Sequence, residues 1–128
     1  MSLVLVISET PSRADSYALA LADSGLEVEV LTNIDTARDR LGETPAHLVI
    51  VDVTSPDAPP GLFVGQAKVA WPDSTVVALT GPVNMACSAV KRMGLWTPDV
   101  ELRHPVGPAR LVAEARALLG RLAGAGCE

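Results

Sequence analysis

The chain has 128 residues, the size of one ordinary domain, and it is 48% hydrophobic but only 3% aromatic, so its core must be aliphatic. The net charge of -5 argues against a nucleic-acid-binding surface, because phosphate contacts need clustered lysine and arginine side chains. No apolar stretch reaches the roughly 18 residues of a membrane-spanning helix, and the start, MSLVLVISET, lacks the basic region and cleavage site of a secretion signal. We therefore expect a cytoplasmic protein.

Strands and helices are expected to alternate from the first residues onward. The fully apolar segment 3–7 predicts a strand, and segment 10–25 predicts a helix with Ser12 as its N-cap. Segment 26–32 alternates apolar and polar residues, as a strand at the edge of a sheet does, and segment 33–42 carries one apolar helical stripe closed by a glycine.

The middle of the chain continues the alternation. A second fully apolar strand is expected at 48–51, ending at the carboxylate of Asp52. A proline-rich loop at 54–61 follows, then a short helix at 62–71. A third apolar strand is expected at 74–80.

The remaining elements are a helix at 83–94, a strand at 99–103 and a helix at 107–124. Strands that alternate with helices of this length predict crossover connections and a parallel sheet. The three uniformly apolar strands fit a sheet centre that is covered on both faces. We therefore predict an α/β, flavodoxin-like, doubly wound (βα)5 fold with a five-stranded parallel sheet in the order 2-1-3-4-5. It should occupy residues 1–122, with 123–128 as a tail or linker.

In such a sheet, ligands bind beyond the carboxyl ends of the central strands, where the strand order reverses. The residues expected at that edge are Ser8, Glu9, Asp52, Thr80, Gly81 and His104. Glu9 and Asp52, with the backbone carbonyl of Thr54, suit a hard divalent cation such as Mg²⁺. A carboxylate beside such a cation can accept a phosphoryl group, which a hydroxyl such as that of Thr80 can hydrogen-bond. No glycine-rich phosphate loop follows the first strand, so nucleotide binding is not expected.

Plainer interpretations of the same residues stay open. Asp52 fits a solvated strand end, and Glu9 fits an acid in the first turn of a helix, where a negative charge is favourable. Thr80 fits a cap of the following segment. His104 fits a partner for Asp52 better than a catalytic base. Cys87 and Cys127 have neither metal-ligand spacing nor a disulfide framework.

Three segments carry a resemblance to the receiver domains of two-component response regulators. VDVTSPD resembles the family's phosphoacceptor region, and PDSTVVALTG resembles its fourth strand. GLEVEVLTNIDTARDRL is similar to its second strand and helix. The resemblance implies that Asp52 is the phosphoacceptor, that Thr80 is the switch hydroxyl, and that Mg²⁺ is the cofactor.

The sequence departs from the family pattern at residues that carry the chemistry. The family ends its first strand with two acidic residues, whereas this chain has Ser8 and Glu9. His104 precedes Pro105 where the family has a lysine, and Glu101 stands where the family commonly has an aromatic residue. Because a carboxylate and a permanent cation are missing, we expect weak Mg²⁺ binding and weak or absent phosphorylation.

The sequence thus predicts a receiver-like domain in bacterial phosphorelay signalling that is not an enzyme and that acts mainly through protein contacts, using residues 83–104 as a docking face. One alternative is a fully functional phospho-accepting receiver; another is a flavodoxin-like enzyme or small-ligand-binding domain. The expected partner is a sensor histidine kinase or another signalling protein, without nucleic acid or membrane. An output domain in a longer parent chain is also compatible with the sequence.

Overall fold

The computed structural model describes residues 3–53, 57–81 and 89–126. In chain order the elements are β1 (Leu3–Ile7), α1 (Pro11–Asp23), β2 (Glu27–Leu31), α2 (Ile34–Arg40), β3 (Leu48–Val53), α3 (Pro59–Ala70), β4 (Thr75–Thr80), α4 (Ala89–Arg92), β5 (Val100–Arg103) and α5 (Pro108–Gly126). Among these residues, no helix combines the length and the hydropathy that crossing a bilayer requires.

The strands form one five-stranded sheet in the order β2-β1-β3-β4-β5, and every neighbouring pair is parallel. The predicted doubly wound, flavodoxin-like fold is therefore confirmed. The strand with alternating residues, β2, lies at an edge, and the three uniformly apolar strands β1, β3 and β4 lie side by side in the middle, as their sequences predict. The register places Val4 beside both Val28 of β2 and Leu48 of β3.

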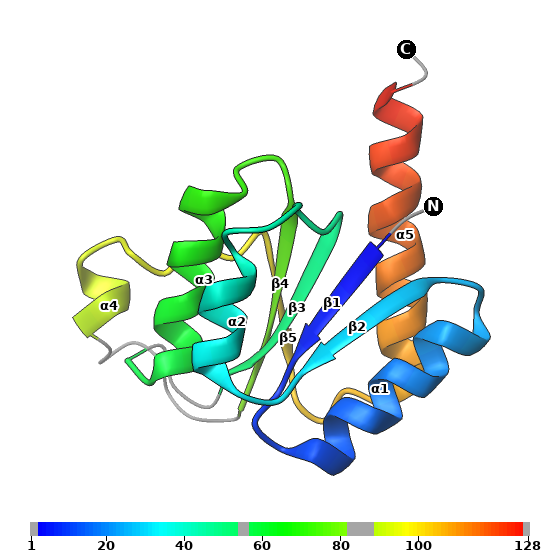
Figure 1. Ribbon diagram of the computed structural model, residues 1–128, viewed down its shortest axis with the longest axis horizontal. Helices are drawn as coiled ribbons and strands as arrows, with labels where there is room; N and C mark the ends of the chain where they lie inside the picture. Colours follow the sequence, from blue (N-terminus) through cyan, green and yellow to red (C-terminus); the bar gives the residue numbers. More distant parts are fainter. Residues whose placement is uncertain (1–2, 54–56, 82–88, 127–128) are drawn as a thin grey trace.

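Helices cover both faces of the sheet, with α1 and α5 on one face and α2 and α3 on the other (Figure 1). Successive residues of a strand point to opposite faces, so each central strand contributes to two separate cores. On the α1/α5 side, Val6 and Ile50 pack with Leu111, whereas on the α2/α3 side Val49 packs with Phe63. Burial on both faces explains why the polar residues of the central strands are confined to the ends of the strands.

The ends of several helices differ from expectation. Ser12 is not the N-cap of α1: the cap is Thr10, its side chain makes no capping hydrogen bond, and Pro11 occupies the first turn. Proline has a φ already suited to the first helical position, so the helix begins one residue before Ser12. For the same reason α3 begins at Pro59, inside the segment predicted as a loop.

Two glycines end their segments as predicted, because both adopt the positive φ that side chains disfavour. Gly25, just after α1, has φ 90, and Gly94, just after α4, has φ 73. Of the helix predicted at 83–94, residues 83–88 lie outside the described residues, and α4 covers Ala89–Arg92.

The buried face of α3 gives a test of the packing. Phe63 is fully buried, whereas Val69 on the same helix is 84% exposed. Phe63→Ala should lower the free energy of unfolding by about 3–5 kcal/mol, because it removes a large side chain and leaves a cavity. Val69→Ala should change it by less than about 0.5 kcal/mol. Urea unfolding followed by circular dichroism measures both, and equal losses would contradict this orientation of α3.

Candidate functional site

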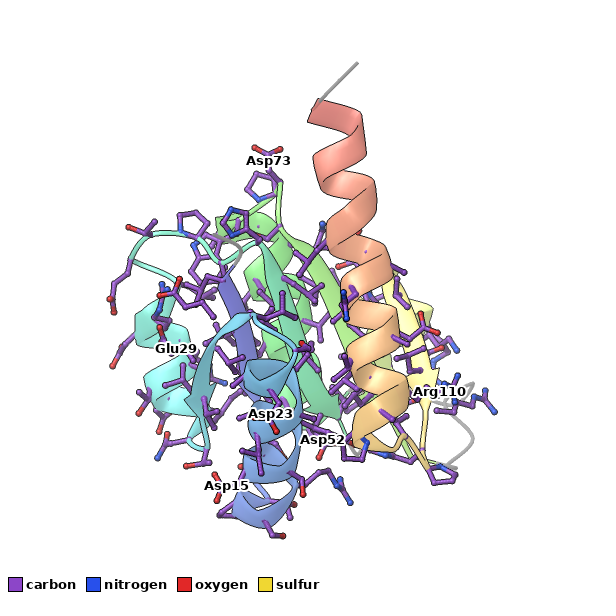
Figure 2. The ribbon with its side chains drawn as sticks, turned by 90° about the vertical axis from the view of Figure 1, so that its right-hand side faces the viewer. Asp15, Asp23, Glu29, Asp52, Asp73 and Arg110 are labelled. Atoms are coloured by element: carbon purple, nitrogen blue, oxygen red, sulfur yellow. The ribbon has the colours of Figure 1, made fainter. Side chains whose placement is uncertain are left out.

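The site lies at the edge of the sheet where the parallel strands end. Asp52 is the penultimate residue of β3, and Thr80 is the last residue of β4. Ser8 directly follows β1, and His104 directly follows β5. Figure 2 places Asp52 at the lower end of the sheet, between α1 and the beginning of α5. This is where a doubly wound sheet positions its ligand site.

Both oxygens of the Asp52 carboxylate have partners. Oδ2 accepts a hydrogen bond from the Ser8 hydroxyl at 3.0 Å and one from the Arg13 guanidinium at 2.6 Å. Oδ1 lies 2.9 Å from Nε2 of His104. Since a carboxylate oxygen only accepts, Nε2 carries a proton in this contact. Asp52 is only 9% exposed, so hydrogen bonds from these partners replace the hydration that its carboxylate would have in water. That burial does not fit the interpretation of Asp52 as a solvated strand end.

Arg13 was not expected in this site. It is the third residue of α1. The hydrogen bond from its guanidinium to Asp52 is shorter than the contacts of Asp52 with Ser8 and His104. One signal in the sequence could have identified it. A cation in the first turn of a helix faces the positive end of the helix dipole, which is unfavourable unless an anion lies nearby. Nothing in the sequence says that Asp52 supplies that anion.

Thr80 and Glu9 lie differently from the predicted site. Thr80 is buried, and its hydroxyl donates to the Leu102 carbonyl at 3.4 Å rather than to Asp52. Its own carbonyl accepts from the His104 backbone N–H at 2.8 Å, which anchors the residue after β5. Glu9 is exposed, whereas the side chains that contact the Asp52 carboxylate are those of Ser8, Arg13 and His104.

In the arrangement that the structure describes, the residues predicted to bind Mg²⁺ do not by themselves form a ligand set for the ion. Within the described part of the chain, no three side chains of the metal-binding types gather at one place. Thr54, whose carbonyl was the third predicted ligand, lies outside the described residues. Asp52, the central ligand, has its Oδ2 occupied by a cation. As arranged here, the donor set does not match the oxygen-rich shell that Mg²⁺ prefers.

An open hollow of about 650 Å³ borders the site between α1 and the segment that leads into α5. Arg13 and His104 both line it, together with the hydroxyl-bearing Ser12, Ser16 and Tyr17. Asp52 itself is not among the residues that line the hollow, but its partners Arg13 and His104 are.

Tyr17 connects the site to the core. Its hydroxyl donates to the Val106 carbonyl at 2.8 Å, and its ring packs in the α1/α5 core. Burial raises the pKa of Tyr17 above its ordinary value, the negative charge of Asp52 raises it further, and the positive charge of Arg13 lowers it. The folded-state pKa therefore exceeds the unfolded value of 10.0, so stability falls as the pH rises above 10.0.

Solved structures share this fold. A CheY-like response regulator receiver domain from Methanospirillum hungatei matches at a TM-score of 0.80 and 19% identity, covering 94% of this chain and 95% of that one. The BeF3-activated receiver domain of DrrB, from Thermotoga maritima, matches at 0.74 and 20% identity over 94% and 98%. The receiver domain of a putative Luxo repressor from Vibrio parahaemolyticus matches at 0.75 and 18% identity over 94% and 91%.

No protein-family model matches the chain, and neither does any curated protein sequence. At these identities the likeness establishes the fold: the chain has the CheY-like receiver-domain fold of response regulators. The resemblance that the motifs around Asp52 and Thr80 predict is confirmed at the level of architecture.

The single tyrosine of the chain makes the charges around Asp52 measurable. Asp52→Asn should lower the pKa of Tyr17, because it removes a negative charge that opposes ionisation of the phenol. Arg13→Ala should raise it, because it removes an opposing positive charge. Tyrosinate absorbance against pH measures both shifts. Asp15→Asn, an exposed change on the same helix, is the control and should leave the curve in place. Shifts in the opposite directions would contradict this geometry.

Proposed function

We propose that the chain is a receiver-type signalling domain of a two-component phosphorelay, with Asp52 as its phosphoacceptor, and that contact with a partner protein carries most of its signal. The observation that carries this proposal is the buried carboxylate of Asp52 at the carboxyl end of the central strand of a receiver fold. A carboxylate in that place can act as the nucleophile toward a phosphoryl donor.

The contacts around Asp52 support a slow transfer of a phosphoryl group to its carboxylate. To attack phosphorus, one carboxylate oxygen must leave Ser8 and Arg13, or leave His104. His104 stands where the resembling family has a lysine, and an imidazole is not the permanent cation that a lysine ammonium is, so it offers less positive charge to an incoming phosphoryl group. Thr80, the proposed switch residue, must turn its hydroxyl away from Leu102 before it can meet that group.

Phosphoryl transfer to Asp52 is directly measurable. A small-molecule phosphodonor with Mg²⁺ should add phosphoryl groups slowly and to only part of the protein, as followed by intact mass, and Asp52→Asn should abolish the addition. Asp73→Asn, at the opposite end of the sheet in Figure 2, is the matched control and should behave as the unchanged protein. His104→Lys should speed the addition by restoring a permanent cation.

Two results would contradict this proposal in different ways. Addition that survives Asp52→Asn would show that Asp52 is not the acceptor. Rapid addition to every molecule of the unchanged protein would instead favour the alternative of a fully functional receiver.

Weak Mg²⁺ binding through Glu9, Asp52 and the Thr54 carbonyl is part of the proposal, and the ion must displace Arg13 from Asp52 Oδ2 to bind there. Ser8 supplies a hydroxyl where the resembling family has a second acid, so the site lacks one negative charge. Ser8→Asp should therefore tighten Mg²⁺ binding severalfold, because one unit charge at about 4 Å is worth about 4 kcal/mol before desolvation is subtracted. Isothermal titration measures the change, and Ser12→Asp, a hydroxyl residue in the neighbouring helical turn, is the control. Equal affinity before and after Ser8→Asp would refute this ligand set.

The proposed docking face includes an apolar groove of about 760 Å³ between α3 and the segment that follows α4. Leu62, Val69, Val90 and Leu95 line it. Within the described residues, the exposed large hydrophobic side chains are Leu19, Leu62, Val69, Met93 and Leu95, and all but Leu19 lie in or beside this groove. An exposed apolar patch of this kind is typical of a protein contact site.

The side chains that line the groove indicate the chemistry of the partner. Lys68 also lines it, but its ammonium is paired with Asp99 at 2.9 Å, so the apolar side chains are what the groove offers. The proposed partner therefore presents apolar side chains to the groove. A histidine kinase or another signalling protein is the expected class of partner.

The conformation of residues 83–104 is expected to change little when Asp52 is phosphorylated. Glu101 is exposed, and its carboxylate accepts a hydrogen bond from Trp96 Nε1 at 3.2 Å. The resembling family commonly has an aromatic residue here, which can turn into the protein interior. The same movement of Glu101 would bury an anion without a partner. Fluoroberyllate, a phosphoryl mimic, should therefore shift amide NMR signals close to Asp52, including that of His104, and leave the rest of residues 83–104 nearly unchanged. Asp52→Asn is the control, and broad shifts through 83–104 would show an intact switch.

The proposal extends to the setting of the domain. We place the receiver-like domain at residues 1–122 and its tail or linker at 123–128, in the cytoplasm. Two of the similar structures belong to longer chains, because this chain covers 54% of full-length DrrB and 27% of NtrX from Brucella abortus. An output domain in a longer parent chain agrees with those lengths.

A further inference from the structure

We propose that Arg13 is the resident cation of the Asp52 site and takes the place of a divalent metal ion, so that the carboxylate is neutralised without metal. This inference deepens the proposed function, because it concerns the same carboxylate, but it makes no use of phosphorylation. It begins from the mismatch between Mg²⁺ and the donor set.

A buried carboxylate needs a positive partner. Asp52 is almost fully buried, and an unpaired charge there would be strongly destabilising. Arg13 contacts one oxygen of Asp52, and the imidazole of His104 contacts the other. Arginine is always protonated, whereas histidine carries a full charge only when its pKa lies above the ambient pH. Arg13 is therefore the partner that supplies positive charge at every physiological pH.

The position of Arg13 is unfavourable for the stability of helix α1. It lies in the first turn of α1, where the helix dipole makes a cation unfavourable. Its nearby hydroxyl-bearing neighbours in the hollow carry no negative charge at neutral pH. The attraction that compensates for this placement is the 2.6 Å contact with Asp52 Oδ2. Arg13 is thus held by the carboxylate rather than by its helix.

The guanidinium and a metal ion exclude one another. A metal bound through Asp52 and Glu9 would need a carboxylate oxygen of Asp52, and Oδ2 already holds Arg13 and Ser8. A divalent ion placed there would also lie against a fixed positive charge, which repels it. The Arg13 side chain is 41% exposed, so it has room to swing into solvent when a metal displaces it. Metal binding therefore proceeds in competition with Arg13.

The test is Mg²⁺ affinity, measured by amide NMR titration of the unphosphorylated protein. Arg13→Ala should tighten Mg²⁺ binding by about tenfold or more, because the competing charge is gone. Arg13→Lys should stay near the unchanged protein, since it keeps the charge. The matched control is Arg110→Ala, which removes one positive charge from the first turn of α5, where Figure 2 shows Arg110 pointing away from Asp52. It should leave the affinity within about twofold.

A purely structural role for Arg13 would give another result. If Arg13 only stabilises the fold, Arg13→Ala lowers the urea midpoint while Mg²⁺ affinity stays the same or falls, and the inference is overturned. If Arg13→Ala does not fold, Arg13→Gln is titrated in its place, with the same criteria. Tighter Mg²⁺ binding without any phosphoryl addition at Asp52 would support this inference and refute the proposed phosphoacceptor. The opposite pair of results would refute this inference alone.

Discussion

The carboxylate of Asp52 is the constraint around which this end of the molecule is arranged. It is carried to the edge of the sheet by a strand that is buried on both faces, and it stays nearly inaccessible to water when it arrives. A charge in that position is tolerable only if other groups replace its hydration. Ser8, Arg13 and His104 do so, from the ends of β1 and β5 and from the first turn of α1. Three separate parts of the chain are thereby tied to the end of one strand.

Such a cluster has a chemical consequence. A carboxylate whose two oxygens are both engaged is a weaker nucleophile and a poorer metal ligand than one that is free, because each new partner must displace an existing one. In the proposed function, the same contacts that stabilise Asp52 therefore reduce its reactivity. The receiver fold is kept, while Asp52, at the carboxyl end of the central strand, is paired with Arg13 and contacts His104.

Asp57 connects the chain that follows β3 to helix α4. Asp57 begins the described chain after β3, and its carboxylate accepts hydrogen bonds from the backbone N–H groups of Ala89 and Val90, at 3.3 and 3.0 Å. Asp57 is thus hydrogen-bonded to the first turn of α4, beside the apolar groove. A partner seated in that groove would contact Val90, whose backbone N–H Asp57 binds.

The sequence by itself determined the fold, because the signals for it are local. The uniformly apolar strands at 3–7, 48–51 and 76–79 indicate burial on both faces, and glycines such as Gly25 end segments by adopting a φ that other residues disfavour. The order of elements and the rule for ligand sites also placed Asp52, Ser8 and His104 at one edge.

The tertiary structure decided which side chains meet there. Arg13 contacts Asp52 across 39 positions of sequence, and His104 contacts it across 52. Glu9, adjacent to Ser8 in sequence, points to solvent, and the hydroxyl of Thr80 turns toward β5. The first residue of α1, Pro11, and its N-cap, Thr10 in place of the predicted Ser12, were also evident only from the backbone conformation. Periodicity reports which face of an element is apolar, but the direction of a polar side chain at a strand end depends on partners brought from distant segments, and no local pattern encodes them.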